Sequence, residues 1–218
     1  MNRDFWMERW EEGQIGFHQS EVNGYLTRHW EKLQAGKGDR VLVPLCGKSK
    51  DMLWLADQGQ KVLGVELSPL AVDAFFMENN IPCSQFENDG FKISESDHIS
   101  LWCGDFFDLT QKHLQGITRV YDRASLIALP PEMREKYSQH MKAMMPAGAR
   151  VLLVTMEYPQ AEMSGPPFSV SHNEVHELYG DAFDISVLEE VDILAMNPQF
   201  KERGLSTLVE KSYLMVKK

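Results

Sequence analysis

Short apolar runs of strand length recur along the chain and alternate with segments whose apolar residues follow a helical period. The runs predict seven strands, at residues 40–45, 61–65, 99–103, 118–122, 150–155, 185–193 and 207–216. The helical periods predict helices at residues 20–34, 51–58, 69–79, 132–145 and 172–180. This alternation favours an open, mostly parallel α/β sheet with helices on both faces. No helix separates the last two strands, so we expect them to pair antiparallel.

The stretch RVLVPLCGKSKDMLWLADQGQKVLGVELS, residues 40–68, organises the predicted sheet. It predicts a strand, a turn at Gly47, a helix and a second strand that ends at Glu66. Parallel strands joined by a right-handed crossover leave a crevice at their carboxyl ends, where ligands bind. A carboxylate about twenty residues beyond the first turn suits the two hydroxyls of a ribose. The alternative is an ordinary strand–helix–strand unit in which Glu66 is a surface residue.

The first turn narrows the class of ligand. The dinucleotide fingerprint GxGxxG is absent. Gly47-Lys48-Ser49 is similar to the end of a phosphate-binding loop, but Leu42 stands where that motif needs a glycine. One glycine after a strand still permits close approach of a less charged ligand. An adenosine without phosphates fits best, which points to S-adenosylmethionine.

The segment FWMERWEEGQIGFHQ, residues 5–19, is rich in aromatic residues: Phe5, Trp6, Trp10 and Phe17. One interpretation is an N-terminal helix that packs these rings on the core. The other is a lid, because aromatic faces suit a flat adenine and attract a sulfonium cation by about 0.5–2 kcal/mol. The two interpretations are compatible, since a lid must also pack. We expect residues 1–38 to form a helical lid within a single domain, residues 1–218.

Charged residues follow two further predicted strands. Asp105, after Gly104, could accept a hydrogen bond from an adenine amino group, although a plain turn explains the same pair of residues. Arg123 is placed to stabilise an anionic substrate. Its alternative role is an ion pair with Asp122 or Glu157.

Two irregular segments follow the predicted parallel strands. Residues 157–171 cannot be regular, because they contain Pro159, Gly165, Pro166 and Pro167. We expect this loop to wall a substrate pocket, with Phe168 as an apolar contact. Residues 197–204 connect the last two strands and bring Lys201 and Arg203 towards the same rim. Earlier in the chain, the polar segment 81–97 predicts a loop with a small hairpin.

Composition and motif content restrict the partners, the compartment and the metal content that we expect. A length of 218 residues, with 43% hydrophobic and 25% charged residues, is ordinary for one globular domain. The net charge of −10 argues against nucleic acid or an anionic membrane as a partner. The polar N-terminus is unlike a signal peptide, and three cysteines suit a reducing cytoplasm. CxxC and HExxH are absent, so we expect no metal. A monomer is the default expectation.

Four segments together resemble the thiopurine S-methyltransferase family in its bacterial form. They are residues 5–19, residues 40–68, YDRASLIALPPEMREKY at 121–137 and SGPPFSVSHNEVHELYG at 164–180. The resemblance extends from residue 5 to residue 216 and includes the closing EKSYLMV. It implies a Rossmann-like class I methyltransferase fold with seven strands, the last of them antiparallel.

The resemblance also implies an activity and a set of site residues. The activity is methyl transfer from S-adenosylmethionine to thiopurines and other aromatic thiols, which leaves S-adenosylhomocysteine. The implied cofactor contacts are Trp10, Leu45, Glu66 and Arg123, with weaker matches at Trp6, Gly47, Gly104 and Asp105. The implied substrate contacts are Phe17, Pro166, Pro167 and a basic residue, for which we choose Arg203 over Lys201. We expect Arg123 to be the catalytic residue.

Other functions stay open from the residues alone. The same fold would suit methylation of selenium or tellurium compounds in metalloid detoxification. An NAD-dependent oxidoreductase on a Rossmann-type sheet is disfavoured by the missing GxGxxG. A non-catalytic adenosine-binding protein would be expected to lose the acid or the lid aromatics, and this chain has both.

Overall fold

The computed structural model describes residues 3–218, which form two compact units. The first unit ends at Tyr121 and the second runs from Asp122 to Lys218. Met1 and Asn2, which belong to the predicted lid, lie outside the described residues. Within the described residues, no helix is long and apolar enough to cross a membrane.

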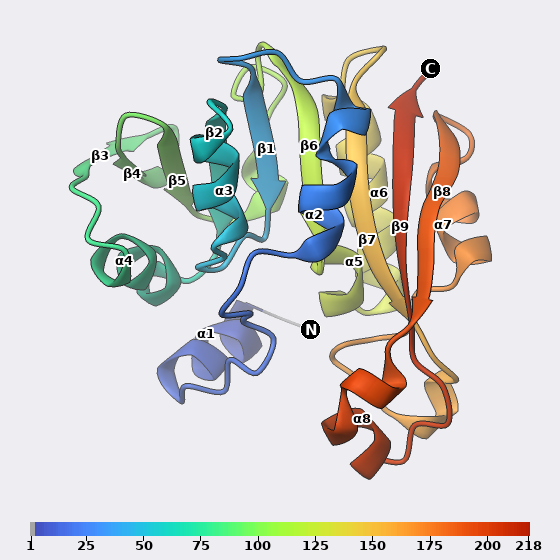
Figure 1. The fold of residues 1–218 in the computed structure, drawn as a ribbon. Coiled ribbons are helices and arrows are strands. Elements are labelled where there is room, and N and C mark those ends of the chain that lie inside the picture. The colour runs from blue at the N-terminus through green and yellow to red at the C-terminus, as the bar shows by residue number, and fades with distance from the viewer. Residues whose placement is uncertain (1–2) are drawn as a thin grey trace. The chain divides into compact units, whose positions relative to one another are not determined.

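The first unit is built on a sheet with the strand order β3-β4-β5-β2-β1-β6. These strands are β1 (Arg40–Pro44), β2 (Lys61–Glu66), β3 (Ser84–Asn88), β4 (Phe91–Glu95), β5 (Ile99–Cys103) and β6 (Ile117–Arg123), the last of which continues into the second unit (Figure 1). β1 pairs in parallel with β2 and β6, and β2 pairs in parallel with β5. Pro44 lies opposite Val65, and Glu66 lies opposite Cys103. The carboxyl ends of the predicted first three strands therefore meet at one edge.

The polar segment 81–97 contains the hairpin that the sequence predicts, and it extends the sheet. β3 and β4 pair antiparallel, and β4 continues antiparallel onto β5. The turn between them has Asp89 at φ 47° and Gly90 at φ 86°, as tight hairpins require. All five residues of β3 are exposed, so no apolar alternation marks this strand in the sequence. The described chain thus has the seven predicted strands and two more.

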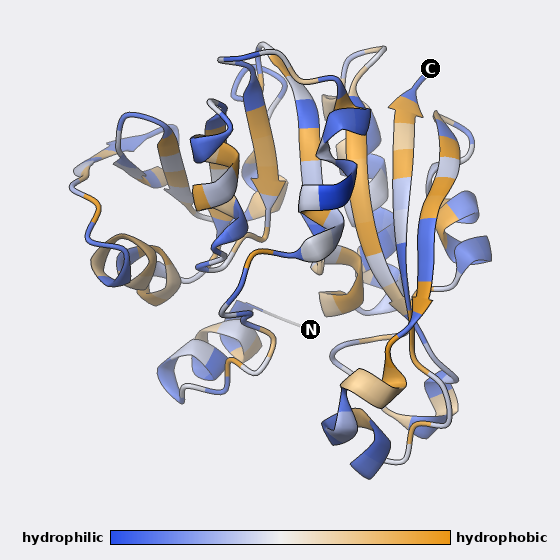
Figure 2. Ribbon diagram, viewed as in Figure 1, coloured by the Kyte–Doolittle hydropathy of each residue, from blue (hydrophilic) through white to orange (hydrophobic). Residues whose placement is uncertain are grey.

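Helices α3 (Asp51–Asp57) and α4 (Pro69–Glu78) connect the parallel strands as predicted. Ser68 caps α4, since its side chain accepts a hydrogen bond from the N–H of Ala71. The buried faces of these helices and the continuous apolar strands make the core of the first unit, and the hydrophobic colour of β1 is plain in Figure 2. Its buried residues include Val41, Leu42, Met52, Leu55, Val62, Leu63, Phe75 and Leu101.

The prediction of one helix over residues 20–34 is wrong at its start. α2 (Gly24–His29) begins four residues later and continues into the 3₁₀ helix η1 (Trp30–Leu33). Asn23 is the cap, because its side chain accepts from the N–H of Tyr25 at 3.0 Å. The N–H of Asn23 itself donates to Asp51 Oδ1 at 2.7 Å, which ties the chain to α3 just before the helix starts. Tyr25, Leu26, Trp30 and Leu33 are all buried.

The second unit contains three strands in the order β7-β9-β8. These are β7 (Arg150–Glu157), β8 (Phe183–Asp192) and β9 (Val209–Lys217). β9 pairs antiparallel with both of its neighbours, which confirms the predicted antiparallel last strand. The helices of this unit are α5 (Ser125–Ala128), α6 (Pro131–Met144), α7 (His172–Tyr179) and α8 (Pro198–Glu202), with short 3₁₀ helices η3 (Gln160–Glu162) and η4 (Leu194–Met196).

Asp51 anchors the start of α2 and should contribute strongly to stability. It is 1% exposed and accepts from Asn23 N–H and from the Tyr121 hydroxyl at 3.0 Å. We expect Asp51→Ala to lower the free energy of unfolding by about 2–4 kcal/mol, because two buried donors lose their acceptor. Urea denaturation measures this change. The control is Asp57→Ala, on an exposed position of the same helix; equal losses in both variants would contradict the anchoring role.

Candidate active site

Glu66 stands at the carboxyl end of β2 and bridges two turns of the first unit. Its Oε2 accepts from the N–H of Gly47 at 2.9 Å, and its Oε1 accepts from the N–H of Ser68 at 2.8 Å. The residue is only 7% exposed, and this burial raises the pKa of its carboxyl group, while the two N–H donors act in the opposite direction. Each carboxylate oxygen has more than one lone pair, so the group can accept further hydrogen bonds from two ligand hydroxyls.

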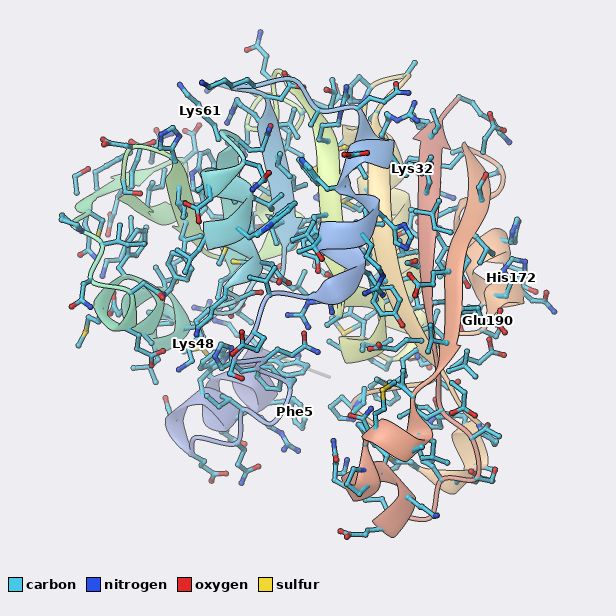
Figure 3. The ribbon with its side chains drawn as sticks, viewed as in Figure 1. Phe5, Lys32, Lys48, Lys61, His172 and Glu190 are labelled. Atoms are coloured by element: carbon cyan, nitrogen blue, oxygen red, sulfur yellow. The ribbon has the colours of Figure 1, made fainter. Side chains whose placement is uncertain are left out.

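The turn after β1 is tight and firmly held. Leu45 has a φ of 46° and Gly47 a φ of 52°, so the backbone is left-handed at both residues. The N–H of Cys46 donates to Val65 O at 3.0 Å. Lys48, labelled in Figure 3, has a side chain that is 11% exposed. It donates to Glu78 Oε1 at 2.6 Å and joins the turn to the end of α4. The backbone of residues 45–48, which a ligand would approach, is thus fixed by Val65 of β2 and by Glu78 of α4.

The predicted lid aromatics form one cluster at the N-terminus of the first unit. The rings of Trp6 and Trp10 each meet Phe17 edge to face, with centroids 5.7 Å apart, and Phe5 meets Trp6 at 5.3 Å. A Cβ atom added at Gly47 would lie 3.4 Å from Trp10 Cζ2, so the Trp10 ring lies against the turn after β1. No residue of α1 (Arg3–Glu11) is buried, although Phe5, Trp6 and Trp10 are partly covered. The structure therefore brings the aromatic cluster to the turn that holds Glu66.

Gly104 and Asp105 lie at the end of β5, beside the same carboxylate residue. The N–H of Gly104 donates to Glu66 O at 2.9 Å. A Cβ at Gly104 would fall 2.5 Å from Phe91 Cδ1, so a larger residue does not fit there. Asp105 is exposed and its Oδ1 caps η2 (Phe106–Asp108) by accepting from Phe107 N–H at 2.9 Å. Asp105 therefore does cap a turn, and its carboxylate still has lone pairs that could accept a further hydrogen bond.

Arg123 is half-buried at the end of β6, in the second unit. Ala124, in the left-handed region at φ 68°, follows it directly and is the N-cap of α5. The two acids considered as ion-pair partners for Arg123 each bind another group. Asp122 Oδ2 accepts from the Tyr137 hydroxyl at 2.8 Å, and Glu157 Oε2 accepts from Lys211 Nζ at 2.8 Å.

Residues 158–169, which we call the Pro-loop, are irregular apart from η3 and are held by internal hydrogen bonds. The Tyr158 hydroxyl donates to Pro167 O at 2.5 Å, and Gln160 Nε2 donates to Met163 O at 2.6 Å. The peptide bonds before Pro166 and Pro167 are both cis. The internal hydrogen bonds make the loop a structured element that can present Pro166 and Pro167 in one geometry.

Arg203 and Lys201 differ in their contact with the Pro-loop. Arg203 Nη1 lies 3.7 Å from Met163 Sδ in the Pro-loop, and its guanidinium lies 5.9 Å from the Phe200 ring. Lys201 is exposed in the last turn of α8. Of the two basic residues, Arg203 has the contact with the predicted substrate-side loop.

Sequence reasoning missed three residues that hold the site elements. Lys48 and Asp51 follow the first turn, and nothing in the apolar periodicity marks Lys48 as largely covered or Asp51 as buried. Arg134 lies on α6 at the same helical face as Tyr137, Ser138 and Met141, all of which are buried. A charged residue on a buried helical face is a recognisable signal, and it could have identified Arg134.

The sheet order, the antiparallel last strand and the carboxylate at the end of β2 define the class I S-adenosylmethionine-dependent methyltransferase fold. Solved structures agree. A methyltransferase from Anabaena variabilis matches all of this chain and 96% of its own, with a TM-score of 0.67 at 12% identity. A phosphoethanolamine N-methyltransferase of Haemonchus contortus, solved with S-adenosyl-L-methionine, matches 99% of this chain and 57% of its own, with a TM-score of 0.64 at 12% identity.

Within that class, the chain belongs to the thiopurine S-methyltransferase family, whose sequence model matches residues 1–218. A thiopurine S-methyltransferase of Nitrosospira multiformis is 53% identical over 99% of this chain and 98% of its own. One from Pseudomonas paraeruginosa is 52% identical over 99% of both chains. The family resemblance stated from the sequence is confirmed.

Asp122, next to Arg123, should make stability fall as pH rises. Burial raises its pKa from 3.8 to about 6, so the unfolded chain loses this proton at lower pH than the folded chain. Stability is therefore lost between those two values and stays lower above them. Asp122→Asn should remove the loss, gaining about 2 kcal/mol relative to the parent between about pH 4.5 and about pH 7.5. Urea denaturation at both pH values measures it; a pH-independent difference would refute the assignment.

Proposed function

We propose that the protein transfers the methyl group of S-adenosylmethionine to the sulfur of thiopurines and other aromatic or heterocyclic thiols. The observation that carries this proposal is the buried Glu66 carboxylate, bridged by Gly47 N–H and Ser68 N–H beneath the aromatic cluster, in a chain of this family. Such a carboxylate fits a ribose without phosphates, because its remaining lone pairs match two hydroxyls. S-adenosylhomocysteine is then the second product.

The cofactor side of the proposal assigns each residue a physical task. Glu66 accepts from the ribose hydroxyls, and Asp105 accepts from the adenine amino group. The cofactor approaches the backbone at Leu45, Gly47 and Gly104, and glycine at position 47 permits the left-handed turn that shapes this backbone. Trp10 and Trp6 cover the site, and their ring faces attract a positively charged sulfur.

The substrate side follows from the chemistry of the reaction. The sulfur lone pair of the thiolate attacks the methyl carbon in line, and the bond from that carbon to the donor sulfur breaks with its electrons returning to that sulfur. Aromatic thiols ionise readily, so the chain needs orientation and exclusion of water more than a strong base. Arg123 stabilises the thiolate or a ring anion as the catalytic residue. Phe17, Pro166, Pro167 and Arg203 bind the heterocycle.

We also propose that the protein works in the cytoplasm as a monomer and without a metal. Cys46, Cys83 and Cys103 are all free thiols, which suits a reducing compartment. Among the described residues, no group of three or more metal-binding side chains lies together. Methylation of selenium or tellurium compounds is the alternative acceptor chemistry for the same site.

Titration calorimetry and a methyl-transfer assay test the function directly. We expect binding of S-adenosylmethionine and S-adenosylhomocysteine but not NAD, followed by methylation of 6-mercaptopurine. Turnover on selenite or tellurite alone would favour the alternative acceptor. Cofactor binding without turnover on any acceptor would indicate a binding protein, and binding of NAD alone would refute the proposal.

Glu66→Ala tests the ribose contact. We expect cofactor affinity to weaken by about 1–3 kcal/mol, because the ribose hydroxyls lose their acceptor. Calorimetry with S-adenosylhomocysteine measures the change. Glu87→Ala is the matched control, since Glu87 is an exposed acid on β3. An unchanged affinity in Glu66→Ala would remove this residue from the site.

Arg123→Ala tests the catalytic assignment. We expect kcat to fall by about tenfold to a hundredfold, since one charged donor to the reacting anion is lost. The melting temperature should change little in comparison, because Arg123 is only half-buried. Steady-state kinetics and a thermal melt on the same preparation measure both. A large fall in melting temperature with unchanged kcat in the remaining folded protein would make Arg123 structural.

A further inference from the structure

Arg134 is a buried charge whose contacts reach several segments of the second unit. The residue is 2% exposed, and burial of a charge is costly unless the charge is paired. Its Nε donates to Leu129 O at 2.7 Å, and its Nη1 donates to the carboxylate of Glu174. Glu174 lies in the first turn of α7, where its own N–H donates to Ser171 Oγ. One guanidinium therefore joins the end of α5 to the start of α7.

The face of the same guanidinium meets the Pro-loop. Arg134 Cζ lies 5.7 Å from the centroid of the Phe168 ring, within the range of a cation–π contact. The N–H of Phe168 donates to Ile127 O at 2.7 Å, so backbone and ring are both fixed. A Cβ at Gly165 would lie 2.5 Å from Phe168 Cδ1, which shows that the ring folds back over the loop. Phe168 thus braces the two prolines that precede it.

The contacts of Arg134 and Phe168 join two segments near residues of the proposed function. One is α5, which follows Arg123, and the other is the Pro-loop, which holds Pro166 and Pro167. Ile127 and Leu129 lie in and just after α5, which begins directly after Arg123 and Ala124. Phe168 directly follows Pro167, whose carbonyl accepts from the Tyr158 hydroxyl. Arg134 contacts both segments at once, although it lies on α6, eleven residues beyond Arg123 at the end of β6.

We propose that Arg134 is a positioning residue for the acceptor thiol. It acts through Phe168 to hold Pro166 and Pro167 in the geometry that receives the heterocycle. The inference rests on the proposed function, because the prolines are its substrate-side residues. A lysine could keep the charge but not the arrangement, since only the planar guanidinium can donate to Leu129 O and to Glu174 while its face covers a ring.

The burial of Arg134 fits this task better than a role in stability alone. Its Nη2 is buried and has no hydrogen-bond partner among the described residues, so the ion is not fully compensated. A buried ion pair contributes less to stability than apolar residues of similar volume often do. The guanidinium fixes the relative positions of three neighbours: it donates to Leu129 O and to Glu174, and its charge lies over the Phe168 ring.

The test uses Arg134→Lys, Phe168→Leu and the double variant in the full-length protein. For both single variants we expect KM for 6-mercaptopurine to rise about fivefold or more, because the loop loses its fixed geometry. kcat at saturating thiol and the Kd of S-adenosylhomocysteine should stay within about twofold, as neither residue has a cofactor task. The double variant should be no worse than the poorer single variant, because both changes break one contact.

Lys142→Met is the matched control, on the same helix as Arg134. Lys142 pairs at 3.1 Å with Asp181, whose side chain is exposed, so this variant removes an ion pair of α6 that does not involve Phe168 or Glu174. A merely structural role would lower the melting temperature without the selective rise in KM. If Arg134→Lys does not fold, Phe168→Leu, which leaves the buried ion pair in place, must still raise KM.

Two outcomes would overturn the inference. One is an unchanged KM in Phe168→Leu or in a folded Arg134→Lys variant. The other is an additive effect of the two changes. Both require an active parent protein, so they are distinct from failure of the proposed function, which would appear as a parent that methylates no thiol.

Discussion

The bridge from Glu66 to the two turns beside it is the interaction on which the candidate site depends. Its two carboxylate oxygens accept from Gly47 N–H and Ser68 N–H, which belong to the turns after β1 and β2. The bridge requires parallel strands in register, because only then do these turns meet at one edge. It also places an ionisable group in a nearly buried position without leaving its oxygens unpaired. The same Glu66 side chain therefore holds two turns of the fold together and supplies the acceptor oxygens of the candidate site.

Much of this arrangement could be predicted from the sequence, for identifiable reasons. The strands around Glu66 are continuous apolar runs, and Ser68-Pro69 is a strong helix start, so local signals and final structure agree. β3 was recognised only as part of a small hairpin, because its five residues are all exposed and carry no apolar pattern. The start of α2 was misplaced because Asn23 is fixed by Asp51, a partner 28 residues away. Local periodicity holds no information about such a partner.

In the substrate-side elements too, local signals predict the kind of structure, whereas the contacts that order it involve residues distant in sequence. Prolines and glycine identified the Pro-loop as irregular, but not the contacts that order it. These contacts come from residues distant in sequence, such as Ser206, whose N–H and hydroxyl both donate to Glu162 at 2.8 and 2.7 Å. Arg134 was overlooked because an arginine in an amphipathic helix is usually a solvent-exposed residue. The family resemblance supplied the site residues, whereas the structure supplies the side chains that hold them.

The N-terminal aromatic cluster has a consequence for the passage of molecules in and out of the site. α1 buries none of its residues, and its rings meet one another and Phe17, with Trp10 also against the turn at Gly47. Swinging the helix aside would therefore expose little new apolar surface, and the free-energy cost of exposure scales with that surface. If the proposed function is correct, displacement of α1 alone would open the cofactor site, and the strands and α2 would not have to separate. We would then expect exchange of a spent nucleoside for a fresh one to leave the core of the first unit folded.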